Sequence, residues 1–196
     1  MLRLDLVVGP NGSGKSTFVR LTLAPALPPG AAFVNADEIA ARRWPGDAEA
    51  HAYAAAQLAA QTREALIEAR TPFIAETVFS HSSKLELVDG ARAAGYTVLL
   101  HVLLVPEELG VARVRHRVAA GGHSVPEQKI RQRYGRLWPL VAEAMTRVDA
   151  ATVYDNSLVS GPRIVAQVAG GAAIGAVSWP SWTPAPLPER WSAPRQ

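Results

Sequence analysis

The sequence predicts an α/β fold in which helices cover a parallel sheet of about five strands. Short apolar runs alternate along the chain with longer segments of helical pattern, which is typical of such a sheet. Of the 196 residues, 48% are hydrophobic, which is enough for one substantial core. The chain has no cysteine, which excludes disulfides, thiolate metal sites and cysteine nucleophiles. We expect a single domain over residues 1–178, followed by a tail over residues 179–196.

Five short apolar runs are the expected strands of the sheet. Parallel strands joined by right-handed crossovers place their C-terminal ends at one edge, where open α/β sheets bind ligands. Functional residues are therefore expected just after each strand. The expected strands are residues 4–8, 32–35, 73–76, 97–105 and 151–154.

Four longer segments have helical patterns. The clearest contains HAYAAAQLAAQTREALIEA, in which alanine and leucine favour helix and the charges gather toward the C-terminal end. The expected helices are residues 16–24, 48–70, 82–94 and 107–120.

The C-terminal part differs in pattern from the rest. RIVAQVAGGAAIGAV, residues 163–177, predicts two apolar strands joined as a hairpin through Gly170 and Gly171. The tail that follows, WPSWTPAPLPERWSAPRQ, is rich in proline and tryptophan, and we expect it to lack regular structure. Two interpretations of the tail are open: it docks a partner, or one or two tryptophans pack on the domain while the rest is loose.

The segment GPNGSGKS matches the phosphate-loop pattern G-x-x-x-x-G-K-[ST] between an expected strand and an expected helix. Glycines let successive backbone N–H groups converge on phosphate oxygens, and the positive end of the helix adds to that attraction. Lys15 is expected to reach the β- and γ-phosphates, and Ser16 to offer its hydroxyl to Mg²⁺. The motif predicts a three-layer P-loop NTPase fold that binds a nucleoside triphosphate, with ATP the default of the class. The expected nucleotide contacts in the loop are Gly9, Pro10, Asn11, Gly12, Ser13, Gly14, Lys15, Ser16 and Thr17.

The second expected strand ends in FVNADEIA, which places Asp37 at the binding edge. A carboxylate there can accept the proton of a substrate hydroxyl as that hydroxyl attacks the γ-phosphate. The alternative is that Asp37 caps the following helix, because aspartate is a preferred N-cap residue. The pattern leaves both roles open.

The third expected strand ends in PFIAETVFS and supplies Glu76. Apolar and small residues leading into an acid resemble the strand that holds Mg²⁺ through water in P-loop proteins, although the usual acid is aspartate. Thr77 and Ser80 follow as candidate hydrogen-bond partners of the substrate. The predicted metal ligands are therefore Ser16 and Glu76.

Residues 107–138 predict an arginine-rich helical lid. Gly121 and Gly122 form a hinge between two helices, the second of which starts at residues 125–127. Arg113 and Arg117 share one helix face, from which they could meet charge on the transferred phosphoryl group. For any single arginine the alternative is a surface salt bridge. The lid contains Arg113, Arg115, Arg117, Arg131, Arg133 and Arg136, while His116 and His123 lack the spacing of metal ligands.

The segments GPNGSGKST, NADEIA, ETVFS, LLVP, GGHSVPEQKIRQRY and YDNS, in this order, resemble the zeta-toxin-like P-loop kinases, particularly their short bacterial members. The resemblance covers roughly residues 4–160. Zeta toxins use ATP to phosphorylate the 3′-hydroxyl of the amino sugar in UDP-N-acetylglucosamine. A toxin of this kind implies an antitoxin protein as its partner.

The resemblance assigns roles to individual residues. It implies that Lys15 and Ser16 bind ATP and Mg²⁺, that Asp37 is the catalytic base and that Arg117 is a lid arginine on the phosphates. It places Glu76 and Thr77 at the substrate. The family's second lid arginine has no clean counterpart, because His123 falls at that position, and Arg131 or Arg133 could replace it from the next turns. The chain also lacks a recognisable insertion for gripping uridine diphosphate.

The function expected from these observations is ATP-dependent phosphorylation of a small-molecule hydroxyl, with UDP-N-acetylglucosamine the first candidate acceptor. A nucleic-acid end kinase is an alternative that suits the pI of about 9.6, but no basic stripe with interleaved aromatic residues appears outside the lid. A nucleotide-dependent regulatory protein is another. No run reaches the length of a membrane span and no signal peptide is evident, so a cytoplasmic location is expected.

Overall fold

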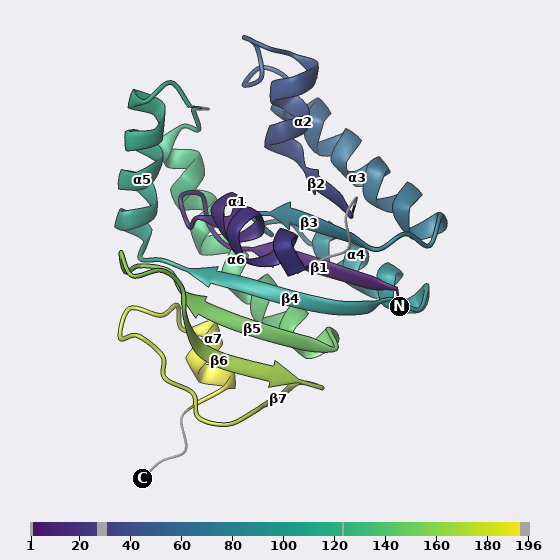
Figure 1. Cartoon of the computed structure of the whole chain (residues 1–196). Coiled ribbons are helices and arrows are strands. Elements are labelled where there is room, and N and C mark those ends of the chain that lie inside the picture. Colours follow the sequence, from purple (N-terminus) through teal and green to yellow (C-terminus); the bar gives the residue numbers. More distant parts are fainter. Residues whose placement is uncertain (1, 27–30, 123, 193–196) are drawn as a thin grey trace.

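A computed structural model describes residues 2–26, 31–122 and 124–192 of the chain. It contains a seven-stranded sheet in the order β2-β3-β1-β4-β5-β6-β7 (Figure 1). The strands are β1 (Arg3–Val8), β2 (Ala32–Asn35), β3 (Phe73–Thr77), β4 (Thr97–Leu104), β5 (Ala150–Asp155), β6 (Arg163–Ala169) and β7 (Ala172–Ala173).

The first five strands are all parallel, which confirms the predicted fold class. β6 adds to the β5 edge in the antiparallel direction, and β7 pairs antiparallel with β6. The pairing of Val168 with Ala173 and of Ala169 with Ala172 confirms the predicted hairpin through Gly170 and Gly171. The sheet is thus mixed, with seven strands where about five parallel strands and a hairpin were expected.

Helices connect the parallel strands, as the alternating pattern predicted. Each of the four expected helical segments contains a helix, but the segment after the phosphate loop is α-helical for only four residues before a π-helix (Val19–Leu23) and a short 3-10 helix (Ala24–Ala26). The α-helices are α1 (Lys15–Phe18), α2 (Ala36–Arg43), α3 (Ala52–Glu68), α4 (Ser83–Ala93), α5 (Glu107–Ala119), α6 (Glu127–Arg147) and α7 (Pro186–Arg190).

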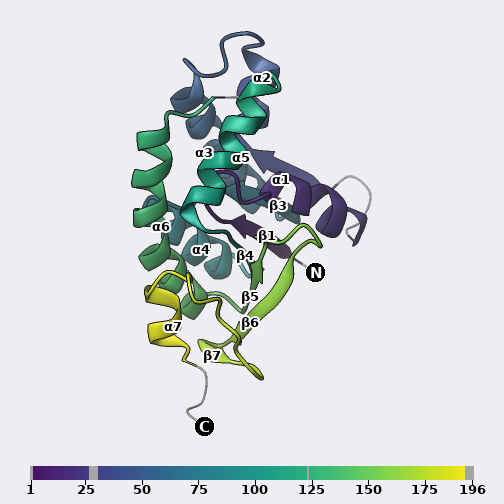
Figure 2. The ribbon, with the colours of Figure 1, turned by 90° about the vertical axis from the view of Figure 1, so that its left-hand side faces the viewer.

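The two faces of the sheet are covered unequally. Helices α4, α6 and α7 pack on one face, and α1 with its π-helical continuation lies on the other (Figures 1 and 2). Alternation along β1 divides the core: Leu4, Leu6 and Val8 face the larger cluster, whereas Val7 packs with Phe18 of α1 in the smaller one. Helical layers on both sides agree with the predicted three-layer arrangement.

The predicted lid consists of α5 and α6, which meet through their own small cluster of Val111, Val114 and Ile130. Helix α6 starts at Glu127, as predicted from the Val-Pro-Glu signal, and continues through Pro139 to Arg147. Its C-terminal half belongs to the main core, where Leu137 is fully buried. The lid is therefore anchored in the body of the molecule by one long helix.

The tail contains regular structure, contrary to the expectation. Its helix α7 buries Leu187 completely, and Trp191 is 5% exposed. The indole of Trp191 donates to the Gly171 carbonyl at 3.0 Å, and the indole of Trp179 donates to the Trp191 carbonyl at 2.6 Å. The expectation was wrong because the burial of Leu187 and Trp191 and the two indole hydrogen bonds outweigh the weak local propensity of a proline-rich segment. Among the described helices, none is long and apolar enough to span a membrane.

Candidate active site

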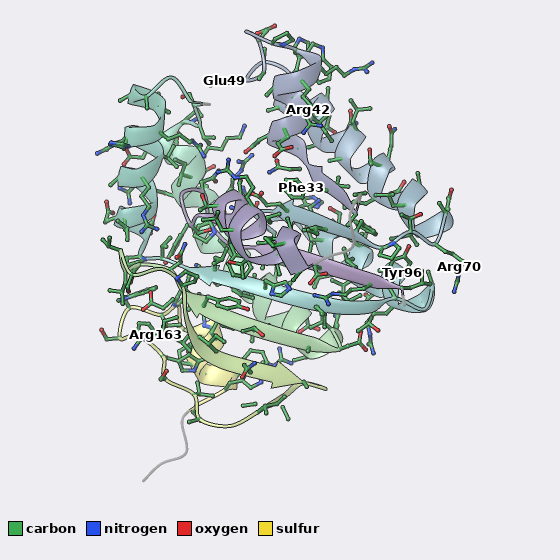
Figure 3. All side chains as sticks on the ribbon, viewed as in Figure 1. Phe33, Arg42, Glu49, Arg70, Tyr96 and Arg163 are labelled. Atoms are coloured by element: carbon green, nitrogen blue, oxygen red, sulfur yellow. The ribbon has the colours of Figure 1, made fainter. Side chains whose placement is uncertain are left out.

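A cleft of about 840 Å³ lies where β1, β2 and β3 end, between the lid helices α5 and α6 and the pair α2 and α3 (Figure 1). Glu49, in the connection between α2 and α3, stands at its upper rim (Figure 3). Of the residues predicted for the site, those that line the cleft are Asn11, Gly12, Gly14, Lys15, Ser16, Thr17, Asp37, Glu76, Thr77, Ser80, Arg113, Arg117 and Arg133.

The phosphate loop runs from β1 into α1, and its glycines are required by close packing. Gly12 has φ +77°, and a Cβ there would meet the Gly110 carbonyl oxygen of α5 at 2.3 Å. A Cβ on Gly9 would meet the Leu103 carbonyl at 2.5 Å. The glycines thus let the loop pass close to the backbone of the neighbouring elements. Of the predicted loop contacts, Gly9, Pro10 and Ser13 do not line the cleft.

Lys15 is 8% exposed and donates from Nζ to the Pro10 carbonyl at 2.9 Å. Burial lowers the pKa of Lys15, while the nearby charges of Glu76 and Asp37 act to raise it. Burial disfavours the charged form of Lys15, so a negatively charged ligand beside Nζ would stabilise the ammonium group. The position suits the binding of phosphate.

A hydrogen-bonded chain joins the ends of β1, β2 and β3. Ser16 Oγ donates to Glu76 Oε1 at 3.0 Å, and Asn35 Nδ2 donates to Glu76 Oε2 at 2.7 Å. Burial raises the pKa of Glu76, and the charge of Lys15 and these two hydrogen bonds oppose that rise. Hydroxyl and carboxylate oxygens are ligands that Mg²⁺ accepts, and it commonly takes only one or two from the protein. Ser16 and Glu76 therefore fit the ion that the loop implies.

Asn35, not Asp37, caps helix α2. Its Oδ1 accepts from the Asp37 N–H at 2.8 Å and from the Glu38 N–H at 3.4 Å. The capping role considered for Asp37 is thus wrong, because the N-cap is two residues earlier and Asp37 lies in the first turn of the helix. That leaves the Asp37 carboxylate available on the cleft wall.

Asp37 stands between positive charges from two sides of the cleft. Its charge acts on Lys15 of the phosphate loop. It also acts on Arg133 of the lid: burial lowers the pKa of Arg133, and Asp37 opposes that effect. The lid helix α6 and the first turn of α2 therefore bring opposite charges to the same cleft.

The lid arginines differ in their surroundings. Arg113 donates to the backbone carbonyls of Asn156 at 2.9 Å and Ser157 at 3.5 Å, while the Asn156 side chain donates to the Ser13 carbonyl at 2.7 Å. The lid, the end of β5 and the phosphate loop are thereby linked. Arg117 lines the cleft one helical turn further along α5.

Arg131 does not reach the cleft, which contradicts its predicted place at the substrate. Its guanidinium pairs with Glu107 at 3.2 Å, with Glu127 at 2.9 Å and with Glu108. Hydrogen bonds to Glu108 and Glu127 raise the pKa of Arg131. Residues two apart on a helix point in nearly opposite directions, so Arg133 faces the cleft and Arg131 faces away. His123, also predicted at the substrate, lies outside the described residues.

Several cleft residues were missed by reasoning from the sequence. Asn35 and Asn156 lie in the quoted segments NADEIA and YDNS, and their place just after a strand was the available signal. Arg63, Lys84 and Lys129 come from helix interiors or a helix start, where nothing in the pattern separates a cleft residue from a solvated one.

Comparisons with known proteins agree with this architecture. A family model described as an AAA domain, AAA_33, matches residues 4–140. No curated protein matches the chain. The solved structures that are similar include the AvrRxo1-ORF1:-ORF2 complex with ATP, at 17% identity and a TM-score of 0.69, with 99% of this chain and 64% of that chain covered. This chain thus spans about two thirds of the length of that one.

Two further structures show the same fold at low identity. One comes from the PezAT chromosomal toxin-antitoxin system of Streptococcus pneumoniae, at 14% identity and a TM-score of 0.62, covering 84% of this chain and 71% of that one. The other is a gluconokinase from Sinorhizobium meliloti, at 18% identity and a TM-score of 0.51, covering 78% and 82%. The phosphate loop, the parallel sheet and the family match over most of the chain lead to one conclusion: this protein belongs to the AAA_33 family of AAA domains and has a P-loop kinase-like fold.

Proposed function

We propose that the protein is an ATP-dependent kinase that transfers the γ-phosphoryl group to a hydroxyl of a small molecule. The observation that carries the proposal is the convergence of Lys15, the Ser16–Glu76 pair and Asp37 in one cleft at neighbouring strand ends. Phosphoryl transfer is catalysed mainly by positioning and by electrostatic stabilisation, and this set of residues supplies both.

In the proposed reaction, the acceptor hydroxyl oxygen forms a new bond to the γ-phosphorus as the bond to the β–γ bridging oxygen breaks. The proton of the hydroxyl passes to the Asp37 carboxylate, and ADP leaves with the electrons of the broken bond. Lys15 binds the phosphates, and Arg117 and Arg133 offset the negative charge on the transferred group. Mg²⁺, held by Ser16 and Glu76, would supply charge neutralisation on the phosphate oxygens when bound.

A hydrolase or regulatory NTPase is less well supported by the same cleft. Such a protein needs a group that orients water, often glutamine, and the described lining contains no glutamine. It does contain a carboxylate beside lid arginines, which suits deprotonation of an alcohol.

The first candidate acceptor is the 3′-hydroxyl of UDP-N-acetylglucosamine, from the resemblance to zeta-toxin-like kinases. Similarity to a structure from a toxin-antitoxin system and to a two-protein complex supports a protein partner with an antitoxin role.

The test is ATP consumption by the purified protein with Mg²⁺ and a panel of nucleotide sugars, followed by mass spectrometry of the products. We expect one acceptor to gain the mass of a phosphoryl group, and Lys15→Ala to abolish that product. ATP binding with every nucleotide sugar unchanged would reject this acceptor class and turn the search to nucleic-acid ends and other alcohols. ATP hydrolysis with no phosphorylated acceptor in any class would reject the kinase.

A further inference from the structure

The cleft wall opposite the lid contains a buried arginine to which the described residues offer no hydrogen-bond or ion-pair partner. Arg63 of α3 lines the cleft, is 5% exposed and has a buried Nε atom with no hydrogen-bond partner. Within residues 2–26, 31–122 and 124–192, no acid lies within salt-bridge distance of its guanidinium. Burial of an unpaired charge is costly, so this side chain is held at an energetic cost to the folded chain.

Four other buried charged side chains of the described chain have partners. Asp5 accepts hydrogen bonds from Arg3 and pairs with His101, and Glu76 accepts from Ser16 and Asn35. Asp155 accepts from the Ser157 N–H and from Arg163, and Lys15 donates to Pro10. Arg63 is the exception among these groups, and it faces the cleft rather than the core.

A second cation stands beside Arg63. Lys84, in the first turn of α4, also lines the cleft, and among the described residues its Nζ donates only to the neighbouring Ser83 hydroxyl, at 3.3 Å. Burial and then the positive charge of Arg63 lower the pKa of Lys84, and Glu86 opposes them weakly. Two like charges are thus brought together in a partly buried place, an arrangement that an anion between them would stabilise.

The α3 wall of the cleft consists of small side chains leading to Arg63. Ala52, Ala56 and Ala59 of α3 line the cleft on the same helix face as Arg63, at spacings of four, three and four residues. These small side chains fill little of the space above the helix. The lid helices stand across the cleft from α3 (Figure 1), so Arg63 and Lys84 line the cleft away from the lid arginines assigned to the phosphates.

We propose that Arg63 and Lys84 form an anion subsite for the acceptor, so that the substrate carries a carboxylate or phosphate group in addition to the hydroxyl that is phosphorylated. The inference rests on the proposed kinase function and narrows its substrate class. The guanidinium of Arg63 offers a planar fork that matches two oxygens of such a group. Lys84 adds a second positive charge, which attracts an anionic acceptor but not a neutral polyol.

The binding test uses the full chain saturated with Mg²⁺ and a non-hydrolysable ATP analogue, which occupies the phosphate loop and the γ-phosphate position. Inorganic phosphate and acetate are then titrated by calorimetry as separate probes of the two anion types. We expect Arg63→Gln and Lys84→Gln each to weaken binding of the preferred anion by at least about 10-fold. Arg70→Gln is the matched control, because Arg70 is exposed beyond the C-terminal end of α3, far from the lid (Figure 3). Equal affinity in all four proteins would overturn the subsite.

The activity test compares small acceptors with and without an anionic group: glycerol against glycerate and glycerol 3-phosphate, and N-acetylglucosamine against UDP-N-acetylglucosamine. We expect transfer only to anionic acceptors, and a rise of at least about 10-fold in KM with Arg63→Gln while kcat changes little. Equal rates of phosphoryl transfer to charged and neutral acceptors would overturn the anion subsite but would still support the proposed kinase activity. Anion binding that depends on Arg63, with no acceptor phosphorylated, would support the subsite and count against the kinase.

Discussion

Asn35 and Glu76, which are paired across β2 and β3, share a 2.7 Å hydrogen bond in which the Asn35 amide donates to the Glu76 carboxylate. The same amide group accepts, through Oδ1, from the Asp37 N–H at 2.8 Å. One buried side chain therefore positions both the proposed metal ligand and the turn of helix that carries the proposed base.

Asn35→Ala should lower stability and activity together. Loss of the helix cap should cost about 1 kcal/mol, and Glu76 should lose the N–H donor that orients it. Asn35→Asp is the matched variant, because it keeps an acceptor for the cap but places a second carboxylate beside Glu76. We expect Asn35→Asp to retain more stability than Asn35→Ala in denaturant unfolding while still impairing Mg²⁺-dependent transfer. Phosphoryl transfer at the wild-type rate in both variants would show that Asn35 has no role in the active site.

Asp37→Asn should abolish transfer while leaving ATP binding intact. The substitution keeps the size of the side chain and removes the proton acceptor, so a loss of at least about 100-fold in kcat is expected. Single-turnover transfer and calorimetric titration with an ATP analogue measure the two properties. Glu38→Gln is the control from the next position, since Glu38 pairs with Arg42 on the exposed side of α2. Retained transfer in Asp37→Asn would exclude Asp37 as the base.

Arg133→Gln should impair catalysis and Arg131→Gln should impair stability, although only one position separates the two residues. Arg133 lines the cleft near Asp37, so its loss should reduce kcat by about 100-fold, as for other donors to a developing charge. Arg131 holds Glu107, Glu108 and Glu127 together, so its loss should lower the melting temperature while kcat stays within a few fold. Equal losses of kcat in both variants would contradict the orientation of α6, in which Arg133 faces the cleft and Arg131 faces away from it.

The Asp5 carboxylate should contribute to the pH dependence of stability. Burial acts to raise its pKa, but hydrogen bonds from His101 and Arg3 outweigh burial, and the net pKa is lowered. A lowered pKa in the folded state means that stability is present above about pH 4, the unfolded value, and is lost as the pH falls through the folded value. Asp5→Asn should therefore be less stable at pH 7 and lose less stability than the wild type below about pH 4. Thermal unfolding measured from pH 7 to pH 2 checks this, with the exposed Asp47→Asn as control.

Trp191→Ala should destabilise the whole molecule. The side chain is buried in the main core and its indole bonds to Gly171 in the hairpin, so a loss of about 3 kcal/mol is expected. Glu189→Ala, an exposed neighbour in α7, should stay within about 0.5 kcal/mol of the wild type. Equal unfolding curves for Trp191→Ala and the wild type would show that the tail is dispensable for stability.

Local sequence determined the parts of this protein that depend on neighbours in the chain. The strand, glycine loop and helix around Lys15 form one continuous motif, and the hairpin at Gly170 and Gly171 is set by two residues that tolerate positive φ. The five parallel strands followed from apolar runs and their spacing. These features could be predicted because their determinants lie within a few residues of one another.

Tertiary structure decided the parts that depend on contacts between distant segments. Asn35 meets Glu76 across 41 positions of sequence, and Asn156 meets Ser13 across 143, which no local pattern encodes. The tail forms helix α7 because Leu187 and Trp191 are buried in the main core. Helical geometry allows only one of Arg131 and Arg133 to face the cleft, and the packing of α6 against α5 and the core selects Arg133. Burial without a partner, the property that marks Arg63, exists only once the chain is folded, because it is defined by what surrounds the side chain in space.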